Sequence, residues 1–286
     1  MSQMEIMIYC KNFDYNYFVE YVDSFIKVIG NVKVICSDTL DSYDYINDDS
    51  HLHVFFCQCF PYEIFNKNLK HAILINTEQA TLPRANQNLK GFLAKNYNII
   101  DYSLENIQII DNQTSMFYLP YQYSEEIDKL KLLVEKTPKY YDVVFMGHGT
   151  PRRDSIQCEL KNRGINILSF NGVFKDARDS LVSKAKILLN IHCSDEFNVY
   201  EAFRCDRWIL SGMMVISEKS INNTILDINE LVIFEDYHKL VDRIINVVEN
   251  YDSHYKSYKE KYDLSLENIK KTRYDALMNI KQKFFA

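Results

Sequence analysis

The sequence predicts an α/β protein with two halves, each built around a parallel sheet. Short apolar runs alternate with helix-length connections along most of the 286 residues, a pattern typical of parallel strands joined by right-handed crossovers. Two runs, Ile187 to Ile191 and Met213 to Ile216, are so rich in apolar residues that we expect neighbouring strands buried on both faces. The charged stretch from Ser124 to Lys139 marks the boundary between the halves.

The first half, residues 1–125, is predicted to hold a series of parallel strands and an amphipathic helix. The helix covers about Phe13 to Ile29, where apolar residues recur at helical spacing. The strands are short apolar runs bounded by polar or turn-forming residues. They are predicted at Glu5–Cys10, Val32–Cys36, His53–Cys57, His71–Asn76, Asn98–Asp101 and Met116–Leu119.

A linker over residues 126–139 leads into the second half, residues 140–250. Its first strand, Tyr141 to Met146, runs straight into a glycine-containing turn, and Gly164 is predicted to end the helix that follows. Residues 251–286 are expected to form terminal helices that pack back across the first domain. The other strands are expected at Asn166–Ser169, at the two apolar runs and at Glu230–Phe234, with helices near Arg153–Asn162, Lys175–Lys184 and His238–Asn250.

Composition and charge argue against several classes of protein. A net charge of −6 and a pI near 5.7 disfavour broad nucleic-acid binding, which needs a basic surface. No apolar run reaches the length of a membrane span, and the start lacks a signal-peptide pattern. The sequence has seven cysteines, and an odd number fits reduced thiols better than a set of disulfides. We therefore expect a cytoplasmic protein. Asp48 and Asp49 lack further carboxylates at persuasive spacing, so we expect a solvated loop there and no metal site.

Charged residues stand out on the helix predicted between the two apolar runs. One face of this helix is apolar, and the opposite face carries Glu201, Arg204, Cys205 and Trp208. Glu201 and Arg204 are three residues apart and could bind hydroxyl and phosphate groups respectively. The alternative is a solvated surface ion pair, but the polar residues that end both flanking strands favour a binding site. Asp206 falls on the apolar face, so it is either buried and paired or a sign that the helix phase is slightly different.

Polar side chains also follow the strands of the second half. Asn190, His192 and Glu218 lie at the ends of the two apolar runs, and open α/β sheets bind ligands at the carboxyl ends of their strands. The turn GHGTPRR, residues 147–153, has glycines that let the backbone approach a ligand and precedes a helix whose amides can face an anion. The alternative interpretation of the turn is a tight loop with solvated arginines. The alternative for His192 is a histidine in the protein core.

Two acidic residues follow strands of the first half and are candidates for a general base. Glu78 comes after the strand that ends at Asn76, and Asp101 closes the next strand. Either carboxylate could reach a cleft between the halves and take a proton from a substrate. The alternative for each residue is helix or turn capping, which we favour when each is taken alone.

Several motifs resemble one protein family when they are taken as an ordered set. The segments VVFMGHGTPRR, KILLNIH, YEAFRCDRWILSG, VISE and VIFEDYHKLVDRI are similar to the carboxyl-terminal donor domain of GT-B glycosyltransferases. In particular, they resemble short bacterial and giant-virus glycosyltransferase-like proteins of the spore-maturation type. INTEQ, DYSLENI and FYLPYQY in the first half resemble segments of the amino-terminal domain of that group.

The resemblance implies two Rossmann-like domains that face each other across a cleft. A nucleotide-sugar would be held by the second domain, and its sugar would pass to an unidentified glycan, protein or small-molecule acceptor on the side of the first. Glu201 and Arg204 would point to the sugar or phosphate of the donor, with Glu78 or Asp101 as the base if the reaction inverts the anomeric centre. The residues implied to bind the donor are Gly147, His148, Arg152, Arg153, Asn190, His192, Tyr200, Asp206 and Glu218.

The implied chemistry requires neither metal nor cofactor. Helix amides and cations would stabilise the departing nucleoside diphosphate, and the nucleotide-sugar is itself a substrate. One position departs from the family pattern, because Arg207 stands where a ribose-binding glutamate is usual. Asp206 and Glu218 are the candidates to replace that carboxylate. The departure keeps open an alternative function, a non-catalytic nucleotide-sugar-binding or scaffold protein with a degenerate site.

Overall fold

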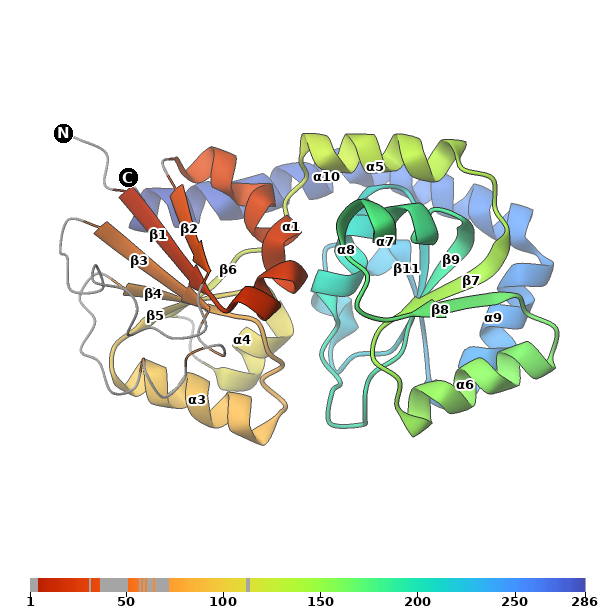
Figure 1. Ribbon diagram of the computed structural model, residues 1–286, viewed down its shortest axis with the longest axis horizontal. Coiled ribbons are helices and arrows are strands. Elements are labelled where there is room, and N and C mark those ends of the chain that lie inside the picture. Colours follow the sequence, from red (N-terminus) through yellow and green to blue (C-terminus); the bar gives the residue numbers. More distant parts are fainter. Residues whose placement is uncertain are drawn as a thin grey trace. The chain divides into compact units, whose positions relative to one another are not determined.

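The chain folds into two compact α/β units, each with one all-parallel sheet and helices around it (Figure 1). The computed structural model describes residues 5–30, 32–36, 51–56, 58, 60, 64, 72–111 and 114–285. One unit comprises Met1–Gln122 and Arg273–Ala286, and the other comprises Tyr123–Thr272. The predicted α/β class with two parallel sheets is therefore confirmed. The loop that contains Asp48 and Asp49 lies outside the described residues.

The sheet of the first unit has six strands in the order β2-β1-β3-β4-β5-β6. Neighbouring strands are parallel and in register, with Tyr9 of β1 opposite Phe55 of β3 and Asn76 of β4 opposite Asp101 of β5. Polar side chains of adjacent strands therefore meet at one edge of the sheet. The strands are β1 (Glu5–Cys10), β2 (Val32–Cys36), β3 (His51–Phe56), β4 (Ala72–Asn76), β5 (Asn98–Asp101) and β6 (Met116–Tyr118).

Three helices are described in the connections of this sheet: α1 (Asn12–Ile29), α3 (Pro83–Ala94) and α4 (Leu104–Ile110). The apolar face of α1 is buried, and the Tyr21 hydroxyl donates a 2.7 Å hydrogen bond to the Leu119 carbonyl. Helix α3 begins with a proline, which has no N–H to leave unpaired in the first turn. Ser103 caps α4 by accepting a hydrogen bond from the backbone N–H of Asn106.

The sheet of the second unit has five strands in the order β11-β10-β9-β7-β8. Strands β9 and β10 are almost wholly buried, as the two apolar runs predicted. The chain passes from β7 to β8 on one side and returns to β9 on the other side of β7, so the winding direction reverses between β7 and β9. The strands are β7 (Tyr141–Met146), β8 (Ile167–Phe170), β9 (Ala185–Asn190), β10 (Met214–Glu218) and β11 (Val232–Glu235).

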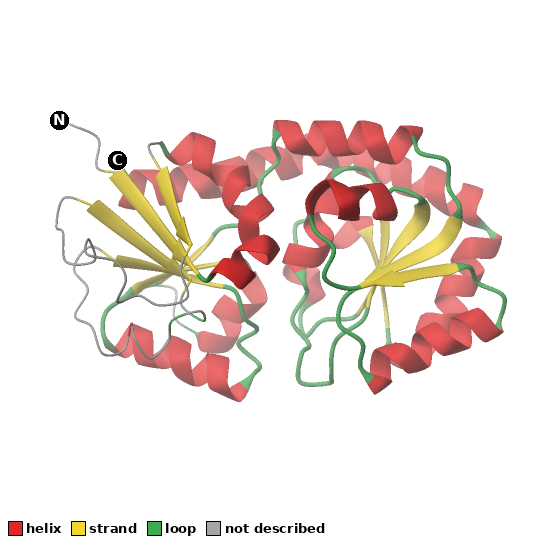
Figure 2. Ribbon diagram, viewed as in Figure 1, coloured by secondary structure: helices red, strands yellow, loops and turns green. Residues whose placement is uncertain are grey.

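Helices cover this sheet on both faces (Figure 2). Helices α6 (Pro151–Asn162) and α9 (Leu240–Glu249) contact each other, while α7 (Lys175–Val182) contacts β9. Helix α8 (Ala202–Leu210) packs on β9 and β10 and is itself contacted by α5 (Glu125–Lys136). Most of the stretch expected as a linker is thus this helix α5.

The carboxyl-terminal segment forms one continuous helix, α10 (Tyr251–Phe284), where we expected several terminal helices. Its first part belongs to the second unit, where the hydroxyls of Tyr258 and Tyr262 donate to the carbonyls of Met213 and Leu210. Its last part, from Arg273 onwards, is grouped with the first unit. No proline or glycine interrupts residues 251–284, so nothing in the chain breaks the helix. Within the described ranges, no helix has the length and apolar character needed to cross a membrane.

Candidate functional site

Charged side chains gather at the carboxyl edge of the second sheet, next to the point where the winding reverses. Strand β7 ends at Met146, β9 at Asn190 and β10 at Glu218, and all three ends lie at the same edge because the strands are parallel. The first turn of α6 and the start of α8 bring further charges to this edge. In open α/β sheets such a reversal point is where ligands bind.

Glu201, at the N-cap position of α8, is the centre of this cluster. Its carboxylate lies 2.6 Å from Nη1 of Arg204 and 3.4 Å from Nη2 of Arg153. The Glu201 and Arg204 side chains are only 16% and 17% exposed, so the interpretation as a solvated surface pair is wrong. Burial by itself raises the pKa of Glu201, but Arg204, His192 and Arg153 together outweigh this and lower it to about 2. The carboxylate therefore stays ionised at neutral pH.

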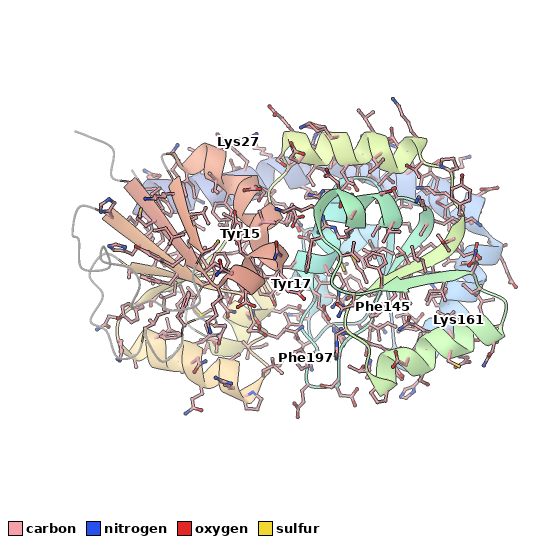
Figure 3. The ribbon with its side chains drawn as sticks, viewed as in Figure 1. Tyr15, Tyr17, Lys27, Phe145, Lys161 and Phe197 are labelled. Atoms are coloured by element: carbon pink, nitrogen blue, oxygen red, sulfur yellow. The ribbon has the colours of Figure 1, made fainter. Side chains whose placement is uncertain are left out.

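Arg153 holds the turn after β7 against the end of β9. Its Nε donates a 2.9 Å hydrogen bond to the Ile191 carbonyl, and its Nη1 donates a 3.0 Å bond to the His148 carbonyl. The guanidinium also lies over the ring of Phe145, at 5.5 Å from the ring centre; Figure 3 shows this ring on β7. Arg153 is 3% exposed, and all of its guanidinium nitrogens have partners.

Arg204 links Glu201 to the strand ends. Its Nη1 also donates a 2.8 Å hydrogen bond to Asn190 Oδ1, and Asn190 Nδ2 donates to Ser217 Oγ at 3.0 Å. The Nη2 group lies so close to Gly147 that a Cβ added there would meet it at 3.2 Å. Among the described residues, the Nε–H and Nη2 groups of Arg204 have no hydrogen-bond partner.

Replacing Gly147 by alanine is expected to push the Arg204 guanidinium out of place. The added Cβ would also meet the Phe145 ring at 3.2 Å, and overpacking of this kind costs roughly 1–3 kcal/mol of stability. Urea unfolding should show a less stable protein. Gly149→Ala is the matched control, because its Cβ would come no closer than 3.4 Å to Asp154. Equal behaviour of the two variants would contradict the prediction.

Glu218 and Arg152 form a second, bidentate pair beside the first. Arg152 Nη1 and Nη2 donate to the two Glu218 oxygens at 2.6 and 2.5 Å, and Arg152 Nε donates to Asp195 at 3.1 Å. The guanidinium stacks 3.7 Å from the centre of the Tyr237 ring, and the Tyr237 hydroxyl donates to the Arg152 carbonyl at 2.9 Å. Arg152 is therefore fully engaged by the protein itself.

The remaining predicted donor-site residues are spread more widely. The His148 side chain is exposed in the turn after β7. Tyr200 is 2% exposed and packs edge-on against Phe234 of β11. Asp206 is also 2% exposed. The sequence left open whether this residue is buried or the helix phase is different, and the structure shows that it is buried.

The expected helix faces of α8 need a correction. Cys205 and Trp208 are 0% and 1% exposed, so they do not lie on a non-core face with Glu201 and Arg204. The physical reason is that α8 is contacted by α5 as well as by β9 and β10, so more than its apolar face is buried. Arg207, at the position where the family has a glutamate, forms an ion pair with Asp179 of α7. Arg178 holds the other oxygen of Asp179 at 2.7 Å.

Restoring a glutamate at position 207 is expected to destabilise the protein by roughly 3–5 kcal/mol, the cost of breaking a buried pair. Arg207 and Asp179 are 8% and 7% exposed, so Arg207→Glu would place two carboxylates together in the interior. Urea unfolding measures the loss. Arg163→Glu should cost less than about 1 kcal/mol, since the Arg163–Asp242 pair is exposed. Adding Asp179→Arg to Arg207→Glu should recover stability, and no recovery would argue against the pair.

In the first unit, Asp101 is wholly buried at the end of β5. It accepts hydrogen bonds from the Ser103 N–H at 2.8 Å, from Asn76 Nδ2 at 2.7 Å and from Asn106 Nδ2 at 3.1 Å. Burial raises the pKa of Asp101, these hydrogen bonds lower it, and the balance is about 7. The hydrogen bond from the Ser103 N–H is the contact expected if Asp101 caps the turn. A pKa near 7 is the value expected of a general base that works at neutral pH.

Glu78 is tied into the same network by its backbone. Its carbonyl accepts hydrogen bonds from Asn76 Nδ2 at 2.7 Å and Asn106 Nδ2 at 2.9 Å, and its N–H donates to Asn76 Oδ1 at 3.2 Å. Glu78 thus helps to orient the two asparagines that hold Asp101.

Sequence reasoning missed the partners that hold these groups in place. Asp195 and Tyr237 bind Arg152, Asn76 and Asn106 bind Asp101, and Phe145 lies beneath two guanidinium groups. The position of Asn76 at a strand end could have singled it out, but nothing in the sequence pairs Asp195 with Arg152. The described part of the chain holds no group of three or more His, Cys, Asp or Glu side chains placed to bind a metal ion.

The chain is similar in sequence to several proteins of one giant virus. No protein-family model matches the sequence. The uncharacterized protein L140 of Acanthamoeba polyphaga mimivirus is 40% identical over 241 residues, which cover 83% of this chain and 78% of L140. The chain belongs to the same family as L140. Protein R358 of the same virus is 30% identical, with 86% of this chain and 89% of R358 covered. Protein L138 is longer, and the chain spans 29% of it at 35% identity.

Among solved structures, several glycosyltransferases share the fold of this chain. T4 phage BGT in complex with UDP and Mn²⁺ matches with a TM-score of 0.61 and 15% identity, covering 99% of this chain and all of the phage protein. AviGT4, a glycosyltransferase involved in avilamycin A biosynthesis, matches with a TM-score of 0.52 and 8% identity over 98% of both chains. The expected GT-B type of fold is therefore confirmed.

Proposed function

We propose that this protein is a glycosyltransferase that moves a sugar from a nucleoside diphosphate sugar to an acceptor hydroxyl. In this reaction the bond between the anomeric carbon and the diphosphate oxygen breaks, and the nucleoside diphosphate leaves with the electron pair. The acceptor oxygen forms the new bond and gives its proton to a base. The observation that carries the proposal is the buried cluster of Glu201, Arg153 and Arg204 at the reversal point of the second sheet.

Arg204 is the cation that we assign to the leaving diphosphate. Arg152 and Arg153 are occupied by Glu218, Asp195, Glu201 and backbone carbonyls, whereas Arg204 keeps Nε–H and Nη2 groups that can donate to a phosphate. The amino termini of α6 and α8 lie at the same edge, and the positive ends of the two helix dipoles favour an anion there. These groups can stabilise the charge that develops as the diphosphate leaves.

The reaction that we propose is independent of a metal ion. The solved T4 phage complex contains Mn²⁺ together with UDP, so the point needs its own test. Arg204 and the two helix amino termini supply positive charge where a metal ion would otherwise act. Turnover that is unchanged by EDTA would support this mode, and activity that depends on added Mn²⁺ would contradict it.

For ribose recognition we propose Glu218, because the usual glutamate is replaced by Arg207. Arg207 is bound to Asp179, and Asp206 is buried within α8, whereas Glu218 ends β10 at the sheet edge that holds the cluster. The bidentate contact with Arg152 fixes the orientation of the Glu218 carboxylate.

The acceptor is a glycan, protein or small molecule that carries a free hydroxyl. A related fold occurs in a DNA modifying enzyme, β-glucosyltransferase, but the net charge of −6 disfavours a nucleic-acid acceptor here. For proton removal we propose Asp101, whose pKa of about 7 matches a base that works near neutral pH.

A thermal-shift screen with nucleoside diphosphates and their sugars is the first test of this proposal. UDP, GDP and their glucose, galactose, N-acetylglucosamine and mannose conjugates should include at least one that raises Tm by several degrees at saturating concentration. No stabilisation by any of them would refute nucleotide-sugar binding altogether. Binding without release of nucleoside diphosphate, with and without acceptor panels, would instead favour the non-catalytic alternative.

A further inference from the structure

A chain of side-chain amides in the first unit leads from helix α3 to Asp101. Asn88 of α3 donates a 3.0 Å hydrogen bond from Nδ2 to Gln58 Oε1, and Gln58 donates from Nε2 to Asn76 Oδ1 at 3.4 Å. Asn76 in turn donates to Asp101 Oδ2 at 2.7 Å. Asn76 and Asp101 are wholly buried, whereas Gln58 and Asn88 are partly exposed. Neutral amides therefore join the buried carboxylate that we propose as the base to groups that a ligand can reach.

The backbone of Glu78 fixes the direction of every hydrogen bond in this chain of amides. The Glu78 carbonyl accepts from Asn76 Nδ2, and the Glu78 N–H donates to Asn76 Oδ1, so the Asn76 amide has a single orientation. Gln58 must then turn its nitrogen towards the Asn76 oxygen, and Asn88 must turn its nitrogen towards the Gln58 oxygen. The oxygen of Asn88 is thereby kept out of the chain as an acceptor.

The two outer amides keep hydrogen-bonding capacity that nothing in the described part of the chain uses. Asn88 Oδ1 accepts no hydrogen bond from the described residues, and the second hydrogens of Gln58 Nε2 and Asn88 Nδ2 have no acceptor among them. Gln58 and Asn88 therefore offer an acceptor and two donors on neighbouring side chains. A hydroxyl group donates one hydrogen bond and has two lone pairs to accept others, so hydroxyl groups match this set.

Within the described part of the chain, the hydrogen-bond network around Asp101 contains no cationic side chain. Its members are side-chain amides and backbone groups around one carboxylate. An acceptor that carries phosphates would need Lys or Arg to bind them. A neutral acceptor with several hydroxyl groups on a rigid ring fits instead, since one hydroxyl can face Asp101 while others bind the outer amides. The single hydroxyl of a serine or threonine side chain cannot fill both places.

We propose that the acceptor is a saccharide, and that Asn88 and Gln58 bind hydroxyl groups of this saccharide other than the one that receives the transferred sugar. The assignment rests on the proposed glycosyltransferase function and names the class of acceptor for it. Asn88 and Gln58 are then specificity-determining residues. An acceptor that lacks these hydroxyl groups is disfavoured, because it leaves the amides without partners in the complex.

A glycan array, probed in the presence of UDP and GDP, tests the class of acceptor directly. We expect wild type to bind at least one arrayed saccharide. Calorimetric titration with that saccharide should show about tenfold or more weaker binding by Asn88→Ala, with an unchanged thermal shift by nucleotides. Alanine is a strong helix former, so α3 is retained in this variant. Gln87→Ala is the matched control and should bind as wild type does, because Gln87 is an exposed amide of α3 without a hydrogen bond to any described residue.

Three results would overturn the inference while the proposed function stands. They are binding of no arrayed saccharide, equal saccharide affinity of wild type and Asn88→Ala, and transfer to serine- or threonine-containing peptides or to DNA in preference to saccharides. The thermal-shift screen with nucleotide-sugars is made without acceptor and reports on the proposed function separately. If none of the nucleoside diphosphates and their sugars stabilises the protein, the proposed function and this inference both fail, whatever the array shows.

Discussion

Replacement of Glu201 by alanine is expected to destabilise the second unit and to abolish sugar transfer together. The substitution leaves Arg153, which is 3% exposed, and Arg204 without the carboxylate that offsets their charge. Breaking a buried ion pair by removing one partner costs about 3–5 kcal/mol. Urea unfolding should show this loss, and nucleoside diphosphate release from the donor should fall to background. A variant of native stability that still transfers sugar would contradict the role given to Glu201.

The pH dependence of stability gives an independent measure of the same interaction. The pKa of Glu201 is lowered to about 2 from an ordinary value of 4.5, so the unfolded chain takes up the proton before the folded protein does. The contribution of Glu201 is therefore fully present above pH 4.5 and is lost as the pH falls through about 2. The difference corresponds to about 3 kcal/mol. Wild type should lose stability over this range more steeply than Glu201→Gln, and parallel curves would show that the pairing contributes little.

The general position of the site could be predicted from the sequence because it depends on backbone topology. Apolar runs at β9 and β10 indicate buried parallel strands, and parallel strands bring their carboxyl ends to one edge. Gly147, Asn190 and Glu218 meet there for that reason alone. The donor-domain motifs lie in the same segments, which is why a family resemblance and a strand pattern lead to the same edge.

The pairing of charges at this edge could not be predicted, because it depends on distances of a few ångströms between residues far apart in sequence. Arg152 was a candidate phosphate ligand, yet it binds Glu218, 66 positions later, and Asp195, 43 positions later. The faces of α8 were misjudged for a similar reason. Helical periodicity shows which residues share a face, but it does not show that α5 also contacts α8 or that Trp208 is buried.

Asp101→Asn is expected to reduce sugar transfer by about 10²–10⁴-fold, the usual contribution of a general base, with little change in donor binding. The side chains are similar in shape, but the amide cannot accept a proton from the acceptor hydroxyl. Calorimetric titration with UDP should give wild-type affinity, which separates loss of the base from loss of the donor site. Transfer within a few-fold of wild type at all pH values would remove Asp101 from the mechanism.

Activity and stability should respond to pH in opposite directions if Asp101 is the base. The pKa of about 7 lies above the ordinary value of 3.8, so the folded protein holds this proton while the unfolded chain has lost it. The contribution of Asp101 to stability is full below pH 3.8 and falls as the pH rises through about 7, by about 4 kcal/mol in total. Over the upper part of this range transfer should increase, because only the ionised carboxylate accepts a proton.

Asn76→Ala offers a way to move this titration without touching the carboxyl group itself. Asn76 donates a 2.7 Å hydrogen bond to Asp101, and a donor of this kind stabilises the ionised form. Its loss should raise the pKa of Asp101 further and shift the rise of transfer rate to higher pH, with the maximal rate largely kept. Because a purely structural asparagine would lower the rate equally at every pH, the shape of the profile distinguishes a tuned base from a damaged fold.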